Sequence, residues 1–92
     1  MIETREAQLS QFAADRVYDL RHERGWTILR LSHELDSHRC RLHPEGFEMS
    51  PAVLGAIERG RDASAQRIRT VSADDLYVLA EVFGVKVEDL LP

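Results

Sequence analysis

Four arginines lie close together in the second half of the chain, and their guanidinium groups could bind phosphate. The chain carries a formal charge of −4, but phosphate contact requires a local positive field rather than a positive total. An ordinary solvated loop fits the same charge pattern equally well. The segment contains one acidic residue, Asp62, and the arginines are Arg59, Arg61, Arg67 and Arg69.

A second group of side chains could bind zinc. His33, His38, Cys40 and His43 carry imidazole and thiolate groups, which are zinc ligands, within a short stretch of sequence. Their spacing matches no zinc-finger pattern, so we predict a polar loop with a reduced thiol and no metal or other cofactor.

Catalysis finds no support in the sequence. There is no nucleophile with a base and an orienting group, and no glycine-rich loop to hold a phosphate. The acidic pairs Asp74-Asp75 and Glu88-Asp89 fall in the first turns of predicted helices, where acids favour the helix dipole. We therefore predict that the chain is not an enzyme.

Length and composition indicate a single small domain spanning residues 1–92. No apolar run approaches the ~18 residues of a membrane span, and the N-terminus lacks the basic start and apolar stretch of a signal peptide. The single cysteine cannot form an internal disulfide. This favours a reducing cytoplasm.

Apolar periodicity predicts an all-α fold with five helices, because apolar residues recur at three- and four-residue steps. Residues 37–48 contain Pro44 and Gly46 and break this period, so they are expected to form a loop. Residues 1–12 either lengthen the first helix or form an arm that pairs subunits. The expected helices cover residues 5–24, 28–36, 51–58, 73–83 and 86–91.

The helix over residues 51–58 has clear signals at both ends. Ser50 is a helix-capping residue and Pro51 suits the first helical position, where its missing N–H costs nothing. Gly60 is expected to end the helix in the left-handed conformation. A helix this short needs its neighbours for stability, and its small outer residues suit a close approach to a DNA groove.

These features together resemble the lambda-repressor/Cro (XRE) family of helix-turn-helix proteins. The resemblance rests on Leu20-Arg21, Gly25-Trp26-Thr27, Leu31-Ser32, Leu35, residues 50–60 ending in Glu58-Arg59-Gly60, and residues 76–85 with Leu90-Leu91. It implies that the second and third helices form a DNA-binding unit and that residues 51–58 enter the major groove.

The resemblance also assigns roles to individual positions. Thr27 and Ile28 match the start of the second helix, which contacts the DNA backbone. Arg59, Arg61 and the loop through Arg67 and Arg69 match phosphate contacts, and Arg21 with Glu58 matches a buried ion pair. The positions at or beside the base-reading surface are Ser50, Pro51, Ala52, Val53 and Ala56.

The chain departs from the family pattern in three ways. Ile28 replaces a glutamine common at that position, and residues 37–48 form an insertion that resembles actinobacterial relatives. Pro51, Ala52 and Ala56 cannot hydrogen-bond a base edge, although alanine can touch a thymine methyl group. Arg39 and Arg41 in the insertion are therefore candidates for additional phosphate or base contacts; the alternative is a loop that contacts nothing.

We predict a sequence-specific, double-stranded DNA-binding transcriptional regulator, similar to a phage repressor or Cro, that acts as a homodimer. The alternative is a protein-interaction adaptor or antitoxin-like module on the same fold. In that case the surface of Pro51, Ala52, Val53 and Ala56 would dock an apolar protein partner. Trp26 is expected to close an edge of the core.

Overall fold

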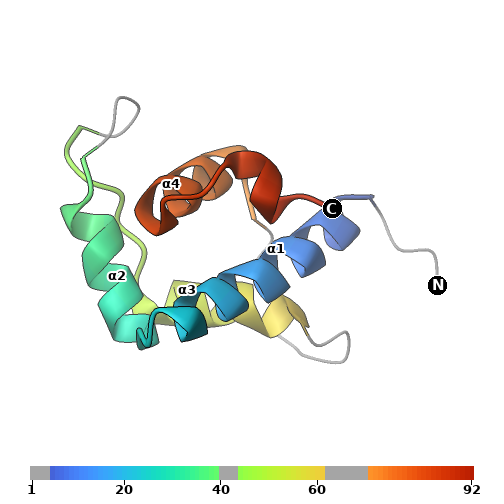
Figure 1. The fold of residues 1–92 in the computed structure, drawn as a ribbon, viewed down its shortest axis with the longest axis horizontal. Helices are drawn as coiled ribbons and strands as arrows, with labels where there is room; N and C mark the ends of the chain where they lie inside the picture. Colours follow the sequence, from blue (N-terminus) through green and yellow to red (C-terminus); the bar gives the residue numbers. More distant parts are fainter. Residues whose placement is uncertain (1–4, 40–43, 62–70) are drawn as a thin grey trace.

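The computed structural model describes residues 5–39, 44–61 and 71–92. These residues form an all-helical structure without strands, as the sequence predicts (Figure 1). None of the described helices combines the length and the apolar character that a membrane crossing requires. The elements are α1 (Arg5–Glu23), α2 (Ile28–Ser37), α3 (Pro51–Glu58), the 3₁₀ helix η1 (Arg59–Arg61), α4 (Ala73–Phe83) and the 3₁₀ helix η2 (Val87–Leu90).

The helices pack around one core. Figure 1 shows the long α1 with α3 beside it, α2 at one end and α4 on the other side, and α3 contacts both α1 and α2. Burying this apolar surface supplies the main favourable free energy of folding. The core residues are Val17, Leu20, Leu31, Leu35, Met49, Leu54, Ile57, Val78, Leu79, Ala80, Phe83 and Leu90.

Most helix ends follow the local signals in the sequence. The Thr27 hydroxyl accepts the N–H of Arg30 at the start of α2. The three-residue spacing of Ser72 and Asp75 predicts the capping box that begins α4, and Gly84 ends that helix in the left-handed conformation at φ 71°. Each cap satisfies a backbone group that the helix itself leaves without a partner.

The expected role of Gly60 is wrong. Arg59 keeps right-handed helical angles, and the chain tightens into η1 instead of stopping. Gly60 has no positive φ; it is buried where η1 packs against α1. Gly60 therefore does not end the helix in the left-handed conformation.

The expected fifth helix is shorter and tighter than predicted. Only residues 87–90 are helical, and they form a 3₁₀ turn in which the Asp89 carboxylate accepts the N–H of Lys86 at 3.1 Å. The sequence predicts that Val87, Leu90 and Leu91 are all buried in this helix; Leu90 is buried, whereas Val87 and Leu91 are half-buried. One turn presents only one side chain fully to the core.

The three- and four-residue apolar steps predict core faces that include Leu9 and Phe12 on α1 and Leu76 on α4, and the observed burial differs in detail. Leu9 and Phe12 are half-buried, and Phe12 lines a shallow hollow beside Pro92. On α4, Leu76 is half-buried, and Val78 is fully buried although the pattern did not single it out.

Arg24 joins the ends of two helices. Its guanidinium donates to the carbonyl of Leu20 at 3.3 Å, at the end of α1, and to the carbonyl of Phe83, at the end of α4. Beside it the half-buried Trp26 stacks on Phe83 with ring centroids 5.9 Å apart. Trp26 packs against the core, as expected.

Candidate nucleic-acid interface

Helix α3 has an exposed beginning and a buried end. Ser50, Pro51 and Ala52 are exposed, and the Ser50 hydroxyl accepts the N–H of Val53 at 3.2 Å. Leu54, Ile57 and Glu58 are buried in the later turns. Of the other predicted reading positions, Val53 and Ala56 are half-buried. The free surface of α3 therefore lies mainly at its first turn.

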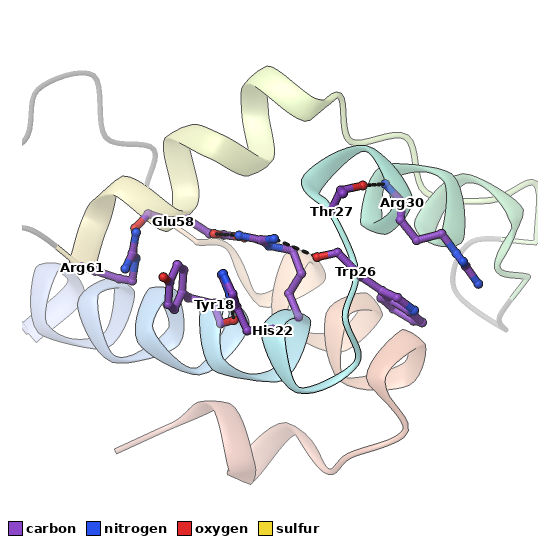
Figure 2. Close-up of polar contacts among 8 residues, drawn as sticks. Tyr18, His22, Trp26, Thr27, Arg30, Glu58 and Arg61 are labelled. Carbon is purple, nitrogen blue, oxygen red and sulfur yellow. Dashed lines mark hydrogen bonds and ion pairs between the residues drawn. The ribbon is translucent and has the colours of Figure 1, made fainter.

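A buried ion pair holds the end of α3 to α1. The Nε and Nη2 atoms of Arg21 each donate to one oxygen of the Glu58 carboxylate at 2.8 Å, and its Nη1 donates to the carbonyl of Trp26 at 2.8 Å. The side chains are only 10% and 4% exposed. Hydrogen bonding to the Glu58 carboxylate raises the pKa of Arg21 above its usual value. The expected pair is present (Figure 2).

A buried hydrogen bond connects α2 to the beginning of α3. The Ser32 hydroxyl donates to the carbonyl of Met49 at 2.6 Å, one residue before the cap of α3. The apolar spacing predicts that Ser32 lies on the buried side of its helix with Leu31 and Leu35, but it does not identify the partner of the hydroxyl. This bond, with the packing of α2 against α3, sets where the exposed first turn begins.

The beginning of α2 presents a second exposed surface. Thr27 is exposed and Ile28 is half-buried against the core. Arg30, which sequence analysis missed, has a 56% exposed side chain, pairs with Glu34 at 2.8 Å and lies 5.4 Å from the Trp26 ring centroid. The sequence signal that could have identified Arg30 as a candidate contact is its position in the first turn of α2.

The described ends of the segment between α2 and α3 are tied to α2 by hydrogen bonds. Arg39 Nη1 donates to the carbonyl of Asp36 at 2.6 Å, and the N–H of Phe47 donates to the carbonyl of Leu35 at 3.2 Å. Gly46 fits this turn at φ 98°, where a Cβ atom would lie 2.2 Å from the Asp36 carbonyl oxygen. Arg39 is exposed but its guanidinium supports the loop, and Arg41 lies outside the described residues.

The predicted absence of a zinc site concerns residues that the structure describes only in part. His33 is exposed on α2, and His38 lies 3.2 Å from a carboxylate oxygen of Glu81. Within the described ranges, no three histidine, cysteine or acidic side chains are grouped to hold a metal ion. Cys40 and His43 lie outside those ranges.

Two of the four clustered arginines are described, and both follow α3. Arg59 and Arg61 are exposed at the opposite end of the helix from Ser50. The Nε of Arg61 donates to the Glu58 carbonyl at 2.9 Å, and its guanidinium carbon lies 3.6 Å from the centre of the Tyr18 ring. Arg67 and Arg69 lie outside the described residues.

Exposed arginines thus lie on both sides of the buried pair. Figure 2 shows Arg61 and Arg30 at opposite ends of the view, with Glu58 between them. Comparison with models of protein families, with curated proteins and with solved structures gives no match. The function is therefore inferred from the geometry of the α2 and α3 surfaces.

Proposed function

We propose that the chain binds double-stranded DNA as a helix-turn-helix transcriptional regulator, with the first turn of α3 in the major groove. One observation carries the proposal: Ser50, Pro51 and Ala52 project from the surface while Glu58 and Leu54 fix the opposite edge of the same short helix. A rigid support behind a small, exposed first turn is what insertion into a groove requires.

The dimensions of α3 support this placement. Eight residues make a helix about 12 Å long, close to the width of the major groove. With α3 in the groove, Arg59 and Arg61 at its end lie within reach of the flanking phosphates. Thr27 and Arg30 at the start of α2 offer a second set of backbone contacts.

The exposed side chains favour affinity through phosphates over direct base reading. Ala52 can contact a thymine methyl group, but neither it nor Pro51 can make the paired hydrogen bonds that distinguish bases by about 1–3 kcal/mol each. Phosphate contacts position a protein on DNA without carrying sequence information themselves. Sequence preference would then come from the inserted loop or from DNA shape.

The proposed mode of DNA binding also favours a homodimer. One small module binds weakly, and two reading helices about 34 Å apart would meet successive turns of the groove. The resemblance to the lambda-repressor/Cro family supports a phage-repressor or Cro-like role, and the single cysteine favours the reducing cytoplasm as its setting.

A salt titration with a matched pair of variants tests DNA binding. The affinity for duplex DNA should fall linearly with the logarithm of salt concentration, with a slope set by the number of phosphates contacted. Ala52→Glu should weaken binding about tenfold or more, because it places a carboxylate against the phosphates. Ala73→Glu puts the same charge in the exposed first turn of α4 and should leave affinity near that of the wild type.

A protein-interaction module is the second candidate, favoured by Leu29. This α2 residue is 55% exposed, the one large hydrophobic side chain so exposed among residues whose burial is described. An apolar protein partner could cover this side chain. Absence of duplex binding by the wild-type protein at low salt would favour this candidate over DNA binding.

A further inference from the structure

The guanidinium of Arg61 is held in place by two contacts. Its central carbon lies 3.6 Å from the centre of the Tyr18 ring, and its Nε donates to the Glu58 carbonyl at 2.9 Å. The ring attracts the cation electrostatically. These contacts come from α1 and α3, so the long Arg61 side chain is ordered from two directions.

Tyr18 is itself supported on its other side. The ring centroids of Tyr18 and His22 are 3.9 Å apart, and the Nδ1 of His22 hydrogen-bonds the Tyr18 carbonyl at 2.8 Å. Figure 2 shows Tyr18 between Arg61 and His22. The second ring limits the movement of the first, so Arg61 rests on a restrained surface.

We infer that Tyr18 is a positioning residue that orders Arg61 to donate its terminal nitrogens to a DNA phosphate. The inference rests on the proposed DNA binding and assigns part of its phosphate contact. The Tyr18 ring covers one face of the guanidinium, and the Glu58 carbonyl accepts the hydrogen bond from Nε. The edge that carries Nη1 and Nη2 therefore remains available to a phosphate. Among the residues that the structure describes, no hydrogen bond engages either nitrogen.

This arrangement suits phosphate chemistry. A planar guanidinium can stack on an aromatic face and still bind phosphate with two parallel hydrogen bonds, which a lysine ammonium cannot do. Ordering the side chain before binding lowers the entropic cost of the contact. Tyr18 would therefore raise affinity without touching DNA.

Fluorescence titrations with a mixed-sequence duplex of about two helical turns test the inference. Tyr18→Leu should weaken binding about two- to tenfold, which corresponds to the cost of ordering one long side chain. Tyr18→Phe keeps the ring and should bind like the wild type. Arg61→Ala should lower the salt slope by about 0.9, and in that background Tyr18→Leu should have no further effect.

Arg61→Lys is a second variant that leaves the interior unchanged. It keeps the charge but loses the flat stack, so it should weaken binding about as much as Tyr18→Leu while nearly preserving the salt slope. Thermal unfolding identifies any variant that does not fold. Tyr77→Leu, on the half-buried surface of α4, is the control for loss of a tyrosine.

The outcomes separate the two proposals. If the wild-type protein binds no duplex at low salt, the proposed function fails and the inference fails with it. If the wild type binds but Arg61→Lys binds equally well, only the inference fails. The same holds if Tyr18→Leu weakens binding equally with Arg61 present and absent, because the stack would then be merely structural.

Discussion

The two ends of α3 are held by different means. The final turn joins α1 through the Arg21–Glu58 ion pair, both members of which are buried. The first turn is held by a hydroxyl cap and by the bond from Ser32 to the Met49 carbonyl, and its side chains reach solvent. A short helix can therefore be anchored in the interior at one end and exposed to solvent at the other.

The largest expected effect comes from breaking the fixed end. Glu58→Gln removes the charge that balances the buried Arg21 guanidinium, which should lower the free energy of unfolding by about 3–5 kcal/mol. Urea unfolding followed by circular dichroism measures it. A loss below about 1 kcal/mol would show that the pair is not the main support of this end.

The bond that precedes α3 should matter less. Ser32→Ala leaves the Met49 carbonyl without its hydroxyl partner, which should cost about 1–3 kcal/mol in the same unfolding experiment. Ser37→Ala, at the exposed last position of α2, is the matched control and should change stability by less than about 0.5 kcal/mol. Equal losses from the two variants would contradict a positioning role for the buried bond.

The Ser50 cap at the exposed end of α3 should contribute less to the free energy of unfolding than the Ser32 bond does. Ser50→Ala removes the acceptor for the Val53 N–H and should cost about 0.5–2 kcal/mol. Ser50→Asp keeps an acceptor and adds a charge that the helix dipole favours, so it should restore stability. If Ser50→Asp is as unstable as Ser50→Ala, the hydroxyl is not acting as a cap.

The smallest expected effect is at an exposed ion pair. Glu34→Gln repeats the chemistry of Glu58→Gln at a pair whose members are 56% and 38% exposed. The stability loss should stay within about 0.5 kcal/mol, because water already solvates both charges. A loss comparable to that of Glu58→Gln would remove the distinction between buried and exposed pairs on which the comparison depends.

Local signals predicted much of the fold. Ser50, Ser72 and Gly84 act within one helical turn of their own positions, so the sequence around each is enough to predict its role. Gly60 failed because its conformation depends on packing against α1, a distant segment. Apolar periodicity located α1 to α4 but predicted a longer last helix than the 3₁₀ turn η2, and it did not single out Val78 as a core residue of α4.

The candidate site was less predictable. The Arg21–Glu58 pair came from a family resemblance, because the partners are 37 positions apart and no local pattern joins them. The contact between Arg61 and Tyr18 depends on where η1 packs on α1, so neither residue's neighbours in sequence announce it. The exposure of the first turn of α3 likewise depends on how the helices pack, so the sequence around it does not predict it.

Arg24 couples the end of α1 to the end of α4. It bonds to carbonyls at the ends of α1 and α4, and its partner Phe83 is 59 positions away along the chain. If the end of either helix frays, the Arg24 guanidinium loses one of its two carbonyl partners. The end of the other helix is then held less firmly. Through this side chain, loosening of one helix end should increase amide exchange near the other.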